Sequence, residues 1–128
     1  MDMMMVIYNA LLADSYIKDQ AAGRIKFYEY PIAGDISGPC IVIDPLGPPQ
    51  SADYGDDDPI TDDYLYQIDV WTKNRLTTKE LAGRVGKVMR SLGFGYFAGS
   101  VDEYDKDTGI YRDARRYRGK AYTDEFES

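Results

Sequence analysis

Residues 64–72 alternate in character over nine consecutive positions, and this pattern constrains the fold more than any other feature of the chain. Tyr64, Tyr66, Ile68 and Val70 are expected to point to one side of a strand, and Leu65, Gln67, Asp69 and Trp71 to the other. Aromatic and β-branched residues with a period of two are typical of a strand with one face against a core. The rest of the chain must therefore provide neighbouring strands and a layer that covers this face.

The first of two predicted helices covers residues 3–19. Its apolar positions follow helical spacing, with Met4, Ile7, Tyr8, Leu11 and Ser15 on one stripe. Gly23 is a suitable stop signal because glycine readily adopts the left-handed conformation that ends many helices. The segment is therefore expected to be one amphipathic helix.

The second predicted helix begins at Thr77 and ends at Gly93. Glu80 follows Thr77 by three residues, which fits a capping box. The apolar stripe of this helix consists of Leu81, Val85, Val88, Met89 and Leu92. Gly83 and Gly86 would allow the helix to approach a sheet closely.

The remaining strand signals complete the fold class. Residues 24–30 alternate, residues 40–43 form an apolar run typical of a strand buried on both faces, and residues 94–104 and 110–122 form a hairpin around the turn 105–109. A chain of 128 residues forms one domain. We therefore expect a single α+β domain, with a mainly antiparallel sheet and two helices packed on one face.

Residues 45–63 differ sharply from the rest of the chain. Proline and glycine recur, and the segment contains acidic residues but no cation; the acidic residues are Asp53, Asp56, Asp57, Asp58, Asp62 and Asp63. This composition predicts a long exposed acidic loop that is solvated or faces a partner. A calcium site is the alternative, although the spacing does not fit an EF-hand.

The composition excludes most catalytic chemistry. The chain has no histidine and one cysteine, Cys40, which lies in an apolar run and is expected to be an inert core thiol. Neither a histidine-dependent nucleophile nor a multi-cysteine metal site can be built from these residues. Asp69 is expected to form an ion pair with an arginine of the last strand. We therefore predict no enzymatic activity, no metal and no cofactor.

Charge points instead to an interaction role. The net charge of −7 makes the chain a poor general nucleic-acid binder, and its apolar runs are too short to cross a membrane. Arg115, Arg116 and Arg118 make the last strand basic, and Arg84 and Lys87 lie on the polar face of the second helix. Charged residues can simply protect an edge strand. The alternative is a head-to-tail contact between copies, with these basic residues facing Asp53, Asp56, Asp57 and Asp58 of a neighbour.

Three short motifs resemble a known family. These are the Gln-Ile-Asp-Val-Trp strand within residues 66–72, the helix running from Glu80 to Phe94, and the stretch 105–117 with its acidic turn and Arg115-Arg116-Tyr117. Together they resemble the tail-completion, or tail-terminator, proteins of long-tailed phages and prophages of Gram-positive bacteria, which are similar to the tail terminator of phage lambda.

The resemblance implies a structural virion protein that forms a sixfold ring on the tail tube, stops its polymerisation and joins the tail to the head. Its implied partners are copies of itself, the tail-tube protein and a head-completion or connector protein, with DNA only in transit. It would act in the virion and, during assembly, in the cytoplasm of the bacterial host. A sibling neck or tail-tube subunit and a host adaptor domain that uses the acidic loop are the alternatives.

Overall fold

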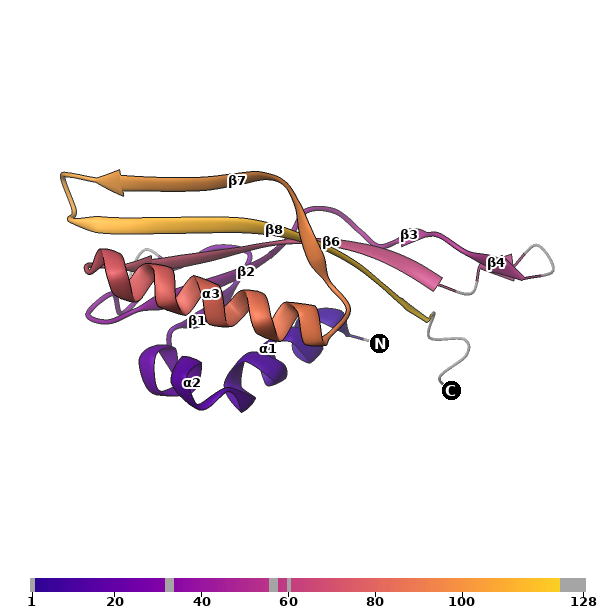
Figure 1. The fold of residues 1–128 in the computed structure, drawn as a ribbon, viewed down its shortest axis with the longest axis horizontal. Helices are drawn as coiled ribbons and strands as arrows, with labels where there is room; N and C mark the ends of the chain where they lie inside the picture. Colours follow the sequence, from indigo (N-terminus) through magenta and orange to yellow (C-terminus); the bar gives the residue numbers. More distant parts are fainter. Residues whose placement is uncertain (1, 32–33, 56–57, 60, 123–128) are drawn as a thin grey trace.

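The computed structural model describes residues 2–31, 34–55, 58–59 and 61–122 (Figure 1). The helices are α1 (Met3–Ala13), α2 (Ser15–Ala21) and α3 (Arg75–Ser91). The strands are β1 (Ile25–Phe27), β2 (Cys40–Pro45), β3 (Gln50–Ser51), β4 (Tyr54–Gly55), β5 (Asp58–Pro59), β6 (Thr61–Thr72), β7 (Gly95–Asp105) and β8 (Ile110–Tyr122). The α+β class is confirmed.

The main sheet has the strand order β1-β2-β6-β8-β7, with β3 also paired to β6. Only β1 and β2 run parallel among these pairs, so the expected, mainly antiparallel character is confirmed. β4 and β5 form a separate two-stranded ribbon. β6 pairs with β8 along its whole length. These two strands therefore extend from the core to the far end of the sheet.

The prediction of one helix over residues 3–19 is wrong, because Asp14 divides it. The Asp14 backbone leaves the helical conformation, with φ −83° and ψ 119°, and its N–H donates to Leu11 O at the end of α1. Its carboxylate then accepts from the Ile17 N–H at 3.1 Å and caps α2. Aspartate is a favoured N-cap and a poor residue in a helix interior. The described residues therefore contain three helices rather than two.

α3 also begins earlier than expected. Asn74, not Thr77, is the N-cap, and its side chain accepts from the Thr77 N–H at 2.9 Å. The expected end is confirmed: Gly93 has φ +90°, and the Phe94 N–H donates to Met89 O at 2.9 Å. This arrangement is a Schellman motif, in which glycine takes the left-handed position.

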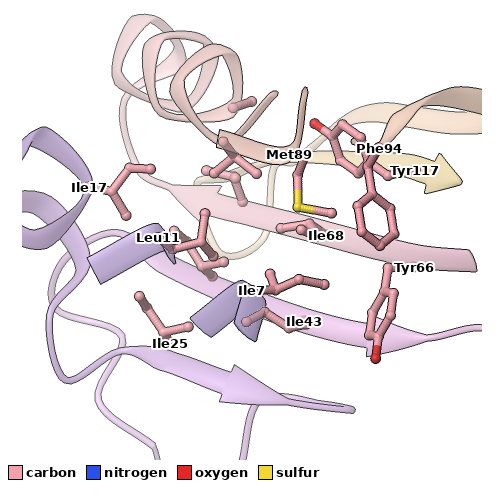
Figure 2. Packing of buried hydrophobic residues seen from close by; sticks show 14 of the residues in the cluster. Ile7, Leu11, Ile17, Ile25, Ile43, Tyr66, Ile68, Met89, Phe94 and Tyr117 are labelled. Atoms are coloured by element: carbon pink, nitrogen blue, oxygen red, sulfur yellow. The ribbon is translucent and has the colours of Figure 1, made fainter. Parts of the chain in front are cut away.

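One hydrophobic cluster joins the helices to the sheet (Figure 2). All three helices contribute buried residues, and the sheet contributes the predicted face of β6; the cluster includes Ile7, Leu11, Ile17, Ile43, Tyr64, Tyr66, Ile68, Val70, Leu81, Val85, Met89, Phe94 and Tyr117. β2 is buried on its other face too, where Cys40 and Val42 lie against Tyr30 and Trp71. Gly86 faces the sheet as predicted, since a Cβ there would lie 2.6 Å from Tyr96 Oη, whereas Gly83 has open space around it.

β1 is shorter than the predicted strand 24–30 because the backbone turns at Tyr28. Tyr28 has φ +69°, and the Glu29 N–H donates across it to Phe27 O at 2.8 Å, which closes a γ-turn. A residue with a side chain is strained in this conformation. The Tyr28 side chain is nevertheless 62% exposed, so burial does not compensate for the strain.

Replacing Tyr28 by glycine should therefore stabilise the fold by about 1 kcal/mol, because glycine adopts a positive φ without this strain. Urea unfolding followed by circular dichroism measures the change. Tyr28→Ala is the matched control, since it removes the same side chain but keeps the strain, and it should give no gain. Equal stabilisation by both variants would contradict the argument.

The acidic segment 45–63 is not the irregular loop that we expected. β2 continues to Pro45, β3 pairs with β6, and β6 already begins at Thr61. We call residues 50–63 the arm; Figure 1 shows that β3 and β4 extend beyond the helices. Within the arm, Thr61 Oγ1 accepts from the Asp53 N–H at 3.0 Å and donates to the Asp53 carboxylate at 2.6 Å.

The β7–β8 hairpin is confirmed, including its turn. Gly109 has φ +74°, and its N–H donates to Asp105 O at 2.8 Å. The strands shift register between Phe97 and Val101, where Gly99 has φ +103°. β7 forms one edge of the sheet and is exposed along nearly its whole length.

Candidate functional site

The arginines predicted to face a neighbour already have partners within the chain. Arg115 Nε donates to Asp113 at 2.8 Å, and Arg116 Nε donates to Gln67 Oε1 at 3.1 Å. Arg118 Nε donates to Asp63 Oδ2 at 2.9 Å. These contacts fix the three guanidinium groups on the sheet, so a partner would meet arginines whose positions are set in advance.

The acidic residues of the predicted interface belong to the arm. Asp53 is exposed and lies 3.4 Å from Lys120 Nζ of β8. Asp58 lies in β5, while Asp56 and Asp57 lie outside the described residues. The arm and the basic strand β8 are therefore neighbours within one chain, joined by Asp53–Lys120 and Asp63–Arg118. Their assignment to a contact between copies stays a prediction.

The two predicted residues of α3 differ in their surroundings. Arg84 forms an ion pair with Asp14 at 3.1 Å, which connects α3 to the junction of α1 and α2. Lys87 is exposed, and no ion pair forms between it and another residue in the described part of the chain. Lys87 is therefore available to a partner without the loss of an internal contact.

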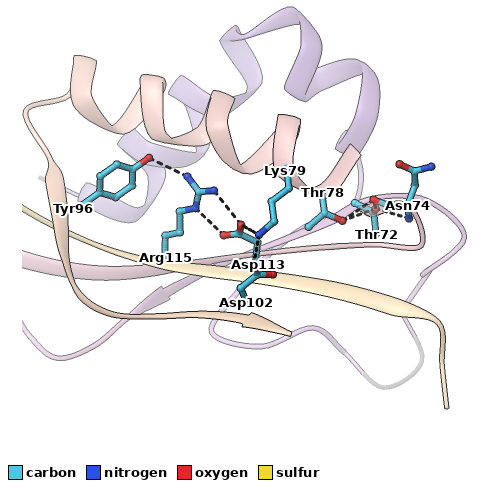
Figure 3. A network of polar contacts seen from close by, with 8 residues as sticks. All are labelled: Thr72, Asn74, Thr78, Lys79, Tyr96, Asp102, Asp113 and Arg115. Atoms are coloured by element: carbon cyan, nitrogen blue, oxygen red, sulfur yellow. Dashed lines mark hydrogen bonds and ion pairs between the residues drawn. The ribbon is translucent and has the colours of Figure 1, made fainter. Parts of the chain in front are cut away.

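Sequence reasoning missed a charge network between α3 and the β7–β8 hairpin (Figure 3). Asp113 is only 2% exposed, and its carboxylate accepts from Lys79 Nζ and Arg115 Nε, both at 2.8 Å. Lys79 also pairs with Asp102 of β7 at 2.7 Å. Arg115 donates to Tyr96 Oη at 3.1 Å. The network therefore connects the edge strand β7 and its neighbour β8 to α3.

The pKa values in this network shift in the directions expected of ion pairs. Burial lowers the pKa of Lys79, but the hydrogen bonds with Asp102 and Asp113 outweigh it and raise the pKa overall. The hydrogen bond to Asp113 raises the pKa of Arg115, although burial opposes it. Burial would raise the pKa of Tyr96, but the contacts with Arg115 and Arg90 lower it. Both cations thus remain charged in the folded protein.

The predicted role of Asp69 is confirmed. Its carboxylate accepts from Arg112 Nε of β8 at 2.8 Å, and Arg112 also pairs with Glu103 of β7 at 2.8 Å. Asp69 is buried, and the strand register places it opposite Ala114, which leaves room for the guanidinium group. This carboxylate is occupied by a structural contact.

A reactive centre would need an accessible nucleophile or a cluster of metal ligands. Cys40 is buried, and burial raises the pKa of its thiol, which disfavours the thiolate. Among the residues described, no group of three or more histidine, cysteine or carboxylate side chains could hold a metal ion. No helix in this part of the chain is long and apolar enough to span a membrane.

A groove with a volume of about 560 Å³ lies beside the N-terminus of α1. It is lined by Asp2, Met3, Met4, Tyr28, Pro45, Gly47, Pro48, Pro49, Tyr64 and Tyr66. Burial raises the pKa of Tyr66 to about 12, with smaller contributions from Tyr64, Asp2 and Tyr28. The groove thus combines tyrosines, prolines and methionines, and this lining contains no nucleophile paired with a base.

The raised pKa of Tyr66 predicts a loss of stability in alkaline solution. A tyrosine in the unfolded chain ionises at about pH 10, so the folded state holds this proton more tightly. The stabilisation is complete below about pH 10 and is lost as the pH rises toward about 12. We expect the urea midpoint to fall less steeply over this range in Tyr66→Phe than in the wild type. Parallel pH profiles would contradict the assignment.

The fold and these contacts define a small α+β protein whose buried carboxylates Asp69 and Asp113 form ion pairs within the chain. The chain belongs to the family of the tail completion protein gp17, whose family model matches residues 5–119. The structure is similar to a chain in the virion of a native gene transfer agent particle, with a TM-score of 0.65 and 18% sequence identity. This likeness covers 91% of the present chain and 92% of the other. No curated protein matches the chain significantly.

These comparisons confirm the resemblance to tail-completion proteins. Family membership rests on the family model, while the likeness to the gene transfer agent chain shows that the fold occurs in a virion. The family membership supports a structural protein of the tail.

Proposed function

We propose that the protein caps the end of the tail tube as a closed ring, ends tail polymerisation and joins the tail to the head. The match to the tail completion family over residues 5–119 carries this proposal. The role is non-catalytic, which agrees with the structural partners found for the buried polar groups Asp69 and Asp113.

The proposed partners are further copies of the chain in a sixfold ring, the tail-tube protein and a head-completion or connector protein. The net charge of −7 supports a ring through which DNA passes without being held, because phosphates are repelled by a negative surface. The proposed contact between copies uses residues of opposite charge: Asp53, Asp56, Asp57 and Asp58 on one copy, and Arg84, Lys87, Arg115, Arg116 and Arg118 on the next.

Deletion of the gene from the particle that encodes it tests this function, with electron microscopy of the products and a plasmid-borne copy as the control. A tail without a terminator should continue to grow, so we expect overlong tails beside DNA-filled, tailless heads. Separate heads and tails of normal length would point to joining alone, as in a neck protein. Normal infectious particles would refute the proposal.

A further inference from the structure

β7 leaves one edge of the main sheet open. It is the last strand of the sheet, and among the described strands only β8 pairs with it. The backbone groups on its outer side can therefore accept an additional strand. The opposite edge offers much less, because β1 has only three residues and ends at the Tyr28 turn.

The open edge has two halves with different chemistry. Before the register shift, Tyr96 is 54% exposed, and Phe97 is exposed as well. Arg90 lies over the Tyr96 ring at 5.9 Å, and Arg118 lies over the Phe97 ring at 5.8 Å. Lys87 is exposed one helical turn before Arg90. This half, which we call the basic aromatic edge (Gly95–Phe97 with Lys87, Arg90 and Arg118), combines apolar surface with positive charge.

The second half of β7 is acidic. Asp102, Glu103 and Asp105 follow the shift, and Asp107 lies in the adjoining turn. Tyr104 is 53% exposed there, so the two halves expose similar aromatic surface and differ in charge. Lys79 and Arg112 already pair with Asp102 and Glu103, so this half attracts an acidic strand less than the half beside Lys87 and Arg90 does.

The arm contains a strand pair that is incomplete by itself. β4 and β5 form a ribbon of two residues each, which continues the β3–β6 pairing through the bond from the Ala52 N–H to Thr61 O at 3.0 Å. A ribbon of two strands gains stability from a third. The arm is acidic in sequence, and Tyr54 of β4 is 60% exposed. Figure 1 shows β4 at the end of the arm, well beyond the helices. Among the described strands, the ribbon thus has no third strand, and β7 has an edge that pairs with none of them.

We infer that the arm of one copy adds its ribbon to the basic aromatic edge of the next copy. Strand addition supplies backbone hydrogen bonds, Tyr54 contacts Tyr96, and the acidic arm faces Lys87 and Arg90 of α3, which lies on the same face as Tyr96. The two surfaces differ, so the contact is head-to-tail and can close a ring. This inference rests on the proposed ring and specifies how its subunits join.

Cysteine cross-linking in assembled particles tests the contact. A chain with Tyr54→Cys and Tyr96→Cys carries one thiol on each proposed surface, while the native Cys40 is buried. A short bismaleimide should link each copy to the next and give a ladder of covalent oligomers larger than dimers. Either single variant can give dimers at most.

Tyr54→Cys combined with Tyr104→Cys is the matched control, because Tyr104 lies on the same edge strand but in its acidic half. We expect it to give at least tenfold less ladder than the first pair. Lys87→Glu with Arg90→Glu, added to the first pair, should also reduce the ladder several-fold. Labelling with N-ethylmaleimide in the free protein establishes that the introduced thiols react.

Tails of normal length without a ladder, from chains whose thiols react, would overturn the inference. Equal ladders from the Tyr96 and Tyr104 pairs would overturn it as well. Neither result depends on the deletion experiment, which tests the capping function. A failed strand contact and a failed function are therefore distinguishable.

Discussion

Replacing Tyr117 by alanine is expected to remove about 3–5 kcal/mol from the free energy of unfolding. Tyr117 is 1% exposed and is the largest fully buried side chain in the described core. Its ring lies 5.3 Å from that of Tyr96, and a Cβ at Gly86 would lie 3.5 Å from its hydroxyl. The alanine variant would leave a cavity between β8 and α3 that rigid neighbours cannot fill.

Domains of this kind have a total stability of roughly 5–15 kcal/mol, so a loss of this size is a large fraction of the total and is readily measured. Urea denaturation followed by circular dichroism measures the loss. Tyr54→Ala is the matched control: it is the same substitution at an exposed site, and it should change stability by less than about 0.5 kcal/mol. A loss below about 1 kcal/mol at Tyr117, or similar losses at both sites, would show that this part of the core is misassigned.

The sheet was largely predictable because strand periodicity depends on local geometry alone. The buried face of β6 follows from alternation, and the same alternation places Asp69 on the opposite face, beside the last strand. The apolar run of β2 is buried on both faces, as its composition indicates. For β6, a one-residue shift would have moved every side chain to the wrong face, so its pattern carried enough information.

The prediction of the first helix failed at Asp14. Two local preferences compete there: the helical spacing of apolar residues and the preference of aspartate for a helix N-cap. Helical spacing from Leu11 leads to Ser15, which is exposed in the structure, whereas the buried residue is Ile17. Asp14 caps a new helix and changes its direction, so the apolar stripe is interrupted. The available signal was the spacing of the buried residues. Leu11 and Ile17 are six positions apart, and two residues with this spacing do not lie on one face of a continuous helix.

The arm could not be predicted, for a different reason. β3, β4 and β5 have two residues each, which is too short for any periodicity to appear. Prolines and repeated aspartates normally indicate a loop. The pairing of β3 with β6 depends on β6 extending back to Thr61, and this extension follows from its pairing with β8.

The sequence predicted only some of the residues of the candidate surfaces. Composition singled out the acidic arm and the arginines of β8, but not their partners. Arg118 binds Asp63, which is 55 residues away, and Arg116 binds Gln67, which is 49 residues away. Such pairs become known only when the strand register is known. The open edge of β7 was likewise hidden, since its exposure depends on the strand order of the whole sheet.

The charge network around Asp113 leads to the second large effect. Replacing both Lys79 and Arg115 by methionine should cost about 3–5 kcal/mol, because it leaves a buried carboxylate without a cation. Either single replacement should cost less, since the other cation still lies 2.8 Å from Asp113. Lys87→Met removes an exposed cation from the same helix and serves as the matched control, with an expected change below about 0.5 kcal/mol.

A third substitution separates loss of charge balance from loss of packing. Adding Asp113→Asn to the double variant removes the uncompensated charge and should restore most of the lost stability, because a neutral amide costs far less to bury than a carboxylate. Urea midpoints of the wild type, the double variant, the triple variant and Lys87→Met at neutral pH decide the matter. If the triple variant is as unstable as the double variant, the contribution of Lys79 and Arg115 lies in their alkyl packing against the sheet, and the ion pairs do not stabilise the hairpin.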